Sequence, residues 1–387
     1  MLHFPVLLEE AVGFLVCNSN GSYADCTFGR GGHSKLILER ISETAELTAL
    51  DKDPEALAYG KQFFNDKRFK ILHKSFNEID DIFKTQSLDG ILFDLGTCST
   101  HFDDKSRGFS FKEDGPLDMR FDPNKGVPVS EWINAASEKD IIDVLFKYGQ
   151  EKNARSIAKA ICLSRKKNKI TRTSSLTEII LSASSRKISK IHPATKSFQA
   201  LRIFINNELD ELKAALEKAK KIIKVDGVIV VISFHSLEDS IVKKSFKTKV
   251  KAFPREIPIN PVITKEFNCI AKKIRPTANE ISSNKRSRSQ IMRVFKKLMQ
   301  LNNLFILFLQ ILLILFLSFE QIKVRWEISL LYGNKDKINN EYQKLKEEEY
   351  KLKTEAYFLN SPARVEKYAK EELKMQKTKP VIINIKE

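Results

Sequence analysis

A glycine-rich turn, DCTFGRGGHS at residues 25–34, is the first stretch whose residue types could do chemistry. It follows a strand-like segment, GSYAD, and precedes SKLILERI, in which apolar residues recur at helical spacing. Glycines at a strand-to-helix turn let backbone N–H groups approach a ligand closely, and the start of a helix favours electron-rich groups. The turn therefore predicts a site for a nucleotide-like cofactor.

Two aspartates at the ends of later strand-like runs could bind the same cofactor. Asp51 ends the run AELTALD, and Asp94 ends a strand within DGILFDLG. In open α/β sheets ligands bind outside the carboxyl ends of strands, and Asp51 can accept hydrogen bonds from both hydroxyls of a ribose. Because the turn lacks the G-x-G-x-x-G spacing of dinucleotide sites, we expect S-adenosylmethionine, a ribose-bearing cofactor without a pyrophosphate. Asp53, followed by Pro54, has the pattern of a helix cap, and we expect it to be structural.

Strand-like runs alternate with helical stretches through the first 298 residues. They end at Asp51, Phe76, Gly96 and Phe234, which predicts a parallel α/β sheet. The segment between the last two runs is mostly helical and too long for one crossover. We therefore predict a Rossmann-like methyltransferase domain of class I over residues 1–101 and 208–297, interrupted by an inserted helical substrate-recognition subdomain over residues 102–207.

The composition indicates a folded, strongly basic protein with reduced thiols. The net charge is +17, while the chain from Glu320 onward holds 15 Lys and Arg against 12 Asp and Glu, so most of the excess lies before it. Such a basic surface usually faces the phosphates of nucleic acid or anionic lipid. Five cysteines, an odd number without C-x-x-C spacing, predict a cytoplasmic domain and no metal site. No signal peptide is expected at the N-terminus.

An apolar run near residue 300 predicts a membrane span. Leu304–Phe319 carries no charge, and with the preceding uncharged residues it approaches the ~20 residues that cross a bilayer. We predict a transmembrane helix over residues 298–320, with a buried core helix as the alternative. The flanking cations and a tryptophan have the pattern of interfacial anchors: Arg293, Lys296 and Lys297 before the span, and Lys323, Arg325 and Trp326 after it.

A heptad pattern follows the span. Apolar residues recur with alternating steps of four and three from Val324 to Leu359, with polar interruptions at Lys335 and Glu349. This predicts an extracytoplasmic coiled coil over residues 321–360 and a C-terminal tail over residues 361–387. One amphipathic helix lying on a domain is the alternative. The methyltransferase domain would then be cytoplasmic and tethered to the inner membrane by one span.

Nine motifs in order resemble the RsmH (MraW) family, which methylates the exocyclic N4 amine of a cytosine in bacterial 16S rRNA. They cover about His3 to Phe295. The resemblance implies S-adenosylmethionine as cofactor and 16S rRNA in the small ribosomal subunit as substrate. The motifs are HFPVLLEEAV, DCTFGRGGHS, DKDPEAL, DGILFDLGTCST, RGFSFKEDGPLDMRFD, YGQEKNARSIAKAI, HPATKSFQALRIFINNEL, ISFHSLEDSIVK and NKRSRSQIMRV.

The resemblance also implies which residues bind the cofactor. His101 stands where many members have glutamine, and its imidazole can still form a hydrogen bond. No general base is named, and Asp94 with His192, Lys196 and His235 are the candidates near the target base. The implied cofactor contacts are Gly31, Gly32, His33, Asp51, Phe76, Asp94 and His101.

A predicted helix after Pro193 could contact the RNA. By steps of three and four, Lys196, Gln199, Arg202 and Asn206 share one face, and Phe198, Leu201 and Ile205 another, which packs. The alternative is an amphipathic helix with a solvated polar face, just as His192 and His235 could be core histidines. The run SRKKNKITR is a candidate phosphate clamp or a solvated charge run.

The tail resembles FtsL, a cell-division protein with one span and an extracytoplasmic coiled coil. The resemblance implies a coiled-coil division partner, and a homodimer is a further possibility. The chain is thus predicted to be a fusion, either natural or from a gene-joining error. Two other functions stay open. One is a membrane-anchored division scaffold with a vestigial methyltransferase domain, and the other is methylation of DNA, which the absent [DNS]-P-P-[YFW] loop disfavours.

Overall fold

The computed structural model describes residues 5–63, 65–184, 192–247, 265–299 and 303–378. The chain divides into two compact units, Met1–Gln300 and Leu301–Glu387. Each unit is described by itself.

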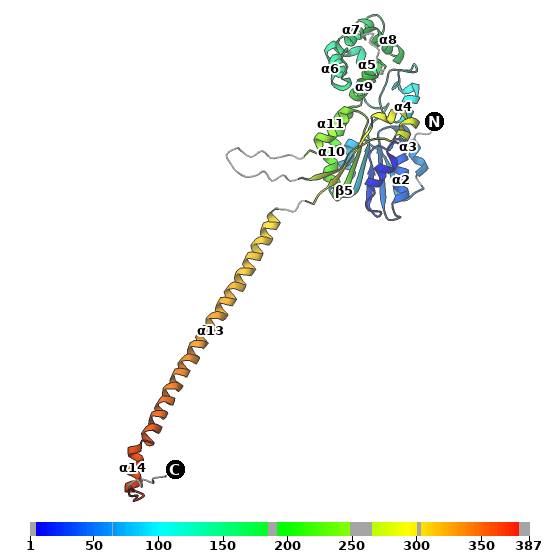
Figure 1. The fold of residues 1–387 in the computed structure, drawn as a ribbon. Helices are drawn as coiled ribbons and strands as arrows, with labels where there is room; N and C mark the ends of the chain where they lie inside the picture. The colour runs from blue at the N-terminus through cyan, green and yellow to red at the C-terminus, as the bar shows by residue number, and fades with distance from the viewer. Residues whose placement is uncertain (1–4, 64, 185–191, 248–264, 300–302, 379–387) are drawn as a thin grey trace, which may run out of the picture. The chain divides into compact units, whose positions relative to one another are not determined.

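A seven-stranded sheet organises the first unit, and it confirms the Rossmann-like α/β fold (Figure 1). The strand order is β3-β2-β1-β4-β5-β7-β6, in which β1 to β5 pair in parallel and β7 pairs antiparallel with both β5 and β6. The carboxyl ends of β1, β2 and β4 therefore lie side by side. The strands are β1 Ser22–Asp25, β2 Glu46–Asp51, β3 Phe69–His73, β4 Leu88–Asp94, β5 Ile223–Ser233, β6 Phe267–Ile274 and β7 Ile291–Lys297.

Helices cover both faces of the sheet. Alternate residues of β5 point into opposite layers, since Val228, Val230 and Ile232 belong to one core while Ile229 and Val231 belong to the other. The first core includes α1 and α2, and the second includes α10 and α11. The helices that follow strands of the sheet or precede them are α1 Leu8–Leu15, α2 Gly32–Arg40, α3 Pro54–Gly60, α10 Glu208–Ile222, α11 Ser236–Ser245 and α12 Ala278–Ser283.

The segment between β4 and α10 builds a third hydrophobic core of its own. This core takes residues from Phe109 to Leu201, and its helices gather beyond one end of the sheet (Figure 1). Phe198 and Leu201 are buried in it and Ile205 packs against it, which confirms the predicted apolar face of that helix. The helices are α4 Ser99–Asp103, α5 Val129–Ala135, α6 Glu138–Gly149, α7 Ala154–Arg165, α8 Thr173–Ala183 and α9 Ala194–Ile205.

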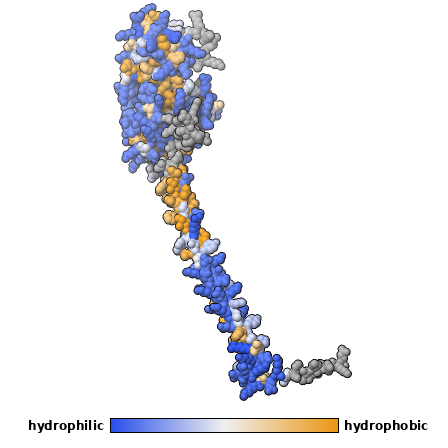
Figure 2. All heavy atoms as spheres, turned by 90° about the vertical axis from the view of Figure 1, so that its left-hand side faces the viewer, coloured by the Kyte–Doolittle hydropathy of each residue, from blue (hydrophilic) through white to orange (hydrophobic). Residues whose placement is uncertain are grey.

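The second unit is mainly one helix, α13 Asn303–Leu359, followed by α14 Pro362–Glu371. An 18-residue window within Phe305–Leu359 has a mean hydropathy of 2.3, so the helix is long and apolar enough to cross a membrane. Figure 2 shows an apolar band along the first part of the helix and hydrophilic side chains beyond it. The predicted span began at residue 298, but the helix begins at Asn303, and residues 300–302 lie outside the described part of the chain. From Asn303 to Leu359 the predicted span and the predicted coiled coil share one uninterrupted helix.

The sheet differs from the expected parallel one in β7, which runs antiparallel to both of its neighbours, β5 and β6. This strand includes the cations that were expected to anchor the membrane span. Arg293 of β7 is buried and donates to Asp239 over 2.6 Å, while the Lys297 Nζ donates to the carbonyls of Lys220 and Ile223 over 2.8 and 2.9 Å. The expectation that Arg293 and Lys297 face lipid is therefore wrong, because both side chains compensate polar groups inside the domain.

The neighbours Lys296 and Lys297 give a matched test of this packing. Burial lowers the pKa of Lys297, whose ammonium covers carbonyls at the end of α10, whereas Lys296 forms a half-exposed ion pair with Asp226 over 2.9 Å. We expect Lys297→Met to lower the free energy of unfolding by about 2–3 kcal/mol, because it leaves two carbonyls without a donor. Lys296→Met should cost under about 1 kcal/mol. Urea unfolding of residues 1–300 measures both, and equal costs would contradict the assignment.

Candidate active site

A cavity opens at the carboxyl ends of β1, β2 and β4. It encloses about 980 Å³, open solvent at its mouth included. Its wall contains six of the seven residues expected to bind the cofactor. Gly31 is the exception, since it does not line the cavity. The six are Gly32, His33, Asp51, Phe76, Asp94 and His101.

Two aspartates, the buried Asp25 and the partly exposed Asp51, hold the glycine-rich turn. Asp25 accepts from the Thr27 N–H over 3.1 Å and from the Ser34 hydroxyl over 2.6 Å, while Asp51 accepts from the Gly29 N–H over 2.8 Å. The turn needs glycine at two positions, because Gly29 and Gly31 have φ of 56° and 73°. Gly31 lies against the rings of Phe28 and Phe63, so its role is to allow close packing behind the cavity.

Asp51 keeps acceptor capacity toward the cavity. Its Oδ2 accepts from Gly29 N, and its Oδ1 accepts from Asp53 N over 2.9 Å. Each carboxylate oxygen has a second lone pair, so both can also accept from hydroxyl groups. Burial raises the pKa of Asp51, and the two N–H donors counter that rise.

Asp94, His33 and Phe76 form another part of the wall. The Asp94 N–H donates to the Thr27 hydroxyl over 2.7 Å, and its Oδ2 lies 3.6 Å from His33 Nδ1. Phe76 packs edge-on against Phe93 with the ring centroids 6.0 Å apart. A carboxylate, an imidazole and an aromatic ring therefore line the cavity together.

His101 lines the cavity next to Asp53. The His101 Nε2 lies 2.6 Å from Asp53 Oδ2, and the ring stacks on Phe109 with the centroids 5.2 Å apart. Asp53 also accepts from the Glu55 N–H over 3.1 Å, which confirms the expected cap of α3. The cap residue is thus also a hydrogen-bond partner of a cavity residue, a role that the sequence analysis did not assign.

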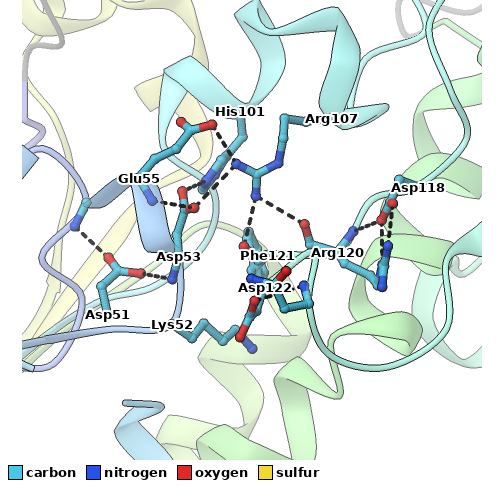
Figure 3. A network of polar contacts seen from close by, with 12 residues as sticks. Asp51, Lys52, Asp53, Glu55, His101, Arg107, Asp118, Arg120, Phe121 and Asp122 are labelled. Carbon is cyan, nitrogen blue, oxygen red and sulfur yellow. Dashed lines mark hydrogen bonds and ion pairs between the residues drawn. The ribbon is translucent and has the colours of Figure 1, made fainter. Parts of the chain in front are cut away.

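Arg107 completes this polar network (Figure 3). Its guanidinium donates to Asp53 over 3.3 Å, to Glu55 over 3.0 Å, and to the carbonyl oxygens of Arg120 and Phe121 over 3.2 and 2.8 Å. Burial of Asp53 raises its pKa, but the hydrogen bond from His101 and the charge of Arg107 outweigh this and lower it. The sequence analysis missed Arg107, although it opens the quoted motif RGFSFKEDGPLDMRFD.

Comparison with known proteins identifies the family. Residues 1–298 match the model of the MraW methylase family, and residues 291–385 match the model of cell division protein FtsL. The chain belongs to the MraW methylase family. It is 45% identical over 303 residues to the ribosomal RNA small subunit methyltransferase H of Marinomonas sp., and 44% identical over 305 residues to that of Alteromonas mediterranea. Each match covers 76% of this chain and 97% of the relative.

Solved structures resemble the methylase only loosely. The crystal structure of an rRNA methylase from Streptococcus thermophilus has a TM-score of 0.32 and 10% sequence identity. The match covers 75% of this chain and 92% of the Streptococcus thermophilus chain. The family assignment rests on the sequence matches.

The wall of the methylase cavity fits S-adenosylmethionine. The oxygens of Asp51 can accept from ribose hydroxyls, and Phe76 offers an apolar surface to a base. Among the described residues, the buried Nδ1 of His101 has no hydrogen-bond partner, so a ligand can supply one. A side chain at Gly29 would meet nothing within 4 Å, which shows open space where the backbone borders the cavity.

The structure corrects the predicted RNA-binding face of α9. Arg202 is buried and makes two hydrogen bonds to Glu208, over 2.9 and 3.0 Å. Asn206 is also buried; it accepts from the Phe121 N–H over 2.8 Å and donates to the Met119 carbonyl over 2.7 Å. Both side chains therefore make structural contacts within the methylase. The prediction failed because helical spacing does not show which polar residues meet buried partners. Lys196 and Gln199 remain partly exposed on this helix.

Three of the candidates near the target base lie outside the cavity wall: His192, Lys196 and His235. His192 is exposed and stacks on Phe111 with the centroids 4.5 Å apart. His235 caps α11, where its Nε2 lies 3.1 Å from Glu238 Oε1. Asp94 is the one of the four that lines the cavity, and Glu208 and Glu238 line it as well.

The two glycines with positive φ give a matched pair of variants. Alanine in the left-handed region costs about 1–2 kcal/mol, which we expect for Gly29→Ala. At Gly31 the new Cβ would also lie 2.7 Å from ring atoms of Phe28 and Phe63, which adds about 1–3 kcal/mol. Urea unfolding should therefore show the larger loss for Gly31→Ala. A larger loss at Gly29 would contradict the packing of the turn.

Asp25 should give the methylase a distinct pH dependence of stability. Burial raises its pKa to about 6, against the opposing hydrogen bonds from Ser34 and Thr27. The folded state binds the Asp25 proton more tightly than the unfolded state, whose pKa is 3.8. The resulting contribution to the free energy of unfolding is full below pH 3.8 and is lost as the pH rises through about 6. Relative to Asp25→Asn, which does not titrate, the wild type should lose roughly 2 kcal/mol between pH 4 and 7. Urea unfolding of both proteins at several pH values measures this difference in the free energy of unfolding. A constant difference across this pH range would show that folding does not raise the pKa of Asp25.

Proposed function

We propose that this chain methylates the exocyclic N4 amine of a cytosine in the 16S rRNA of the bacterial small ribosomal subunit, with S-adenosylmethionine as donor. The observation that carries the proposal is the cavity at the ends of β1, β2 and β4, whose wall combines Asp51, Asp94 and His33 in a chain of the MraW methylase family. Relatives that this chain covers almost completely are named ribosomal RNA small subunit methyltransferase H.

The chain contributes mainly positioning and electrostatics. When bound, S-adenosylmethionine supplies a methyl group on a positively charged sulfur. Asp51 accepts from its ribose, and the turn from Gly29 to His33 sets the position of the cofactor relative to Asp94. The backbone N–H of Asp94 donates to the Thr27 hydroxyl, which fixes the position of the residue. Its carboxylate can accept a hydrogen bond from the target amine and stabilise the positive charge that develops on nitrogen.

A basic stripe on the helical insert supports RNA as the substrate. Six cations just before α7, along it and in the loop after it are exposed, and none of them pairs with a carboxylate of the described residues. Such a stripe attracts a phosphate backbone, because binding releases the condensed counterions. Exposed stacking of His192 on Phe111 offers an aromatic surface to an unstacked base nearby in the same insert. The stripe consists of Lys152, Arg155, Lys159, Lys166, Lys167 and Lys169.

The C-terminal unit supports a second role at the membrane. Its match to the FtsL model and the apolar window of α13 favour a single span, a cytoplasmic methylase domain and a coiled-coil division partner. A second copy of this chain is the alternative partner.

Transfer of labelled methyl groups tests the enzymatic function. Residues 1–298 should label unmodified small ribosomal subunits from S-adenosylmethionine, and nuclease digestion should place the label on N4 of one cytosine. Asp94→Ala should lower the rate by roughly 10²-fold or more, because it removes a charge acceptor at the reacting amine. Asp226→Ala, at an exposed aspartate in the β5 strand, is the control that should keep full activity.

The same assay separates the alternatives. A folded domain that binds no cofactor and gives no label would favour a division scaffold with a vestigial methyltransferase domain. Label on duplex DNA in competition with small subunits would favour a DNA enzyme. Label on a different atom or base would retain the methylase and refute the N4-cytosine assignment.

A further inference from the structure

The imidazole of His101 is held on one side by a carboxylate. Its Nε2 lies 2.6 Å from Asp53 Oδ2, both side chains are more than nine-tenths buried, and His101 lines the cavity. A carboxylate can only accept. The short contact therefore places a hydrogen on Nε2.

The second nitrogen of this ring is the group that the site leaves for a ligand. Among the described residues, Nδ1 of His101 is buried and has no hydrogen-bond partner. In a neutral imidazole with the hydrogen on Nε2, Nδ1 carries a lone pair and is an acceptor. A buried acceptor without a partner is unfavourable, and a bound N–H or O–H group would relieve this cost.

The ring and its carboxylate have little freedom to rearrange. His101 stacks on Phe109 and touches Phe121, with centroids 5.2 and 5.3 Å apart. The other oxygen of Asp53, Oδ1, accepts from the Glu55 N–H over 3.1 Å and from Arg107 over 3.3 Å (Figure 3). Asp53 thus presents only Oδ2 to the imidazole.

We propose that Asp53 is a positioning residue, which holds His101 in the tautomer whose Nδ1 accepts a hydrogen bond from an N–H or O–H group of the bound cofactor. The cofactor is the partner because the Asp53 backbone N–H also binds Asp51, the carboxylate that accepts from the ribose. This inference rests on the proposed use of S-adenosylmethionine. It adds Asp53, which lies outside the cavity wall, to the residues that determine the affinity.

The substitution Asp53→Asn reverses this arrangement while preserving the helix cap. Asparagine caps a helix about as well as aspartate. If its carbonyl oxygen keeps the Glu55 N–H and Arg107, its NH₂ faces Nε2 of His101 and donates to it. The hydrogen of the imidazole then moves to Nδ1, so the cavity presents a donor where the cofactor also has a donor.

A glutamine at position 101 removes the dependence on Asp53. Its carbonyl oxygen is an acceptor in every state, and its amide can turn it toward either partner. Asp53→Asn should therefore weaken cofactor binding when residue 101 is histidine and have little effect when it is glutamine. A merely structural role of Asp53 predicts the same loss in both backgrounds.

The experiment is a double-mutant cycle on the full chain in detergent, with S-adenosylmethionine binding followed by calorimetry. Asp53→Asn should raise the Kd about 10- to 100-fold, the range for leaving a buried donor without a partner. In the His101→Gln background, adding Asp53→Asn should change the Kd less than about 3-fold. This comparison does not depend on the affinity of His101→Gln itself. Asp104→Asn, at the cap of the short helix Lys105–Arg107, is the matched control that should bind like the wild type.

The outcomes separate this proposal from the proposed function. An unchanged Kd in Asp53→Asn, or equal losses in both backgrounds, would overturn the positioning role, and thermal unfolding of each variant shows whether the loss is one of folding. Failure of the wild type to bind S-adenosylmethionine would overturn both proposals. If the variants show the predicted changes in Kd but the protein does not methylate small ribosomal subunits, the positioning role is supported. Only the proposed substrate is then refuted.

Discussion

The site depends on burying several carboxylates around one cavity and supplying each with donors. A buried carboxylate without partners is strongly unfavourable. Asp25 therefore binds a hydroxyl and an N–H, Asp51 binds two N–H groups, and Asp53 binds a histidine, an arginine and its own helix. These donors belong to the turn after β1 and the start of α2, to α3 with its cap, and to α4 and the short helix Lys105–Arg107. The requirement for compensation thus brings separate segments of the chain to one edge of the sheet.

The same requirement joins the helical insert to the cofactor cavity. Arg107 donates to Asp53 on one side and to the carbonyl oxygens of Arg120 and Phe121 on the other. Asn206, at the end of α9, then binds the backbone of Phe121 and Met119. The cavity residue Phe121 is therefore held both by the network around Arg107 and by the helix that leads to α10. The cavity and the helical insert share this loop, so the placement of the insert depends on buried hydrogen bonds as well as on its own hydrophobic core.

The C-terminal unit begins after the methylase core has closed. The last strand, β7, ends at Lys297 and α13 begins at Asn303, while the FtsL match starts at residue 291, within β7. The matches to the rRNA methyltransferase relatives cover 76% of this chain and 97% of each relative. The cavity residues come entirely from the first unit.

The sequence by itself determined the features that depend on local order. The glycine-rich turn, the aspartates that end β1, β2 and β4, and the apolar run of α13 follow from short-range patterns, because strand direction and helical spacing place neighbours in the chain. Tertiary structure alone decided which polar side chains are structural. Arg202, Asn206 and Lys297 had the pattern of exposed cations and amides. Arg202 instead meets a buried carboxylate on the next helix, and Asn206 and Lys297 meet carbonyls from distant segments. The Asp53–His101 contact spans 48 residues, and no local spacing predicts a pairing that only the folded sheet brings within hydrogen-bond distance.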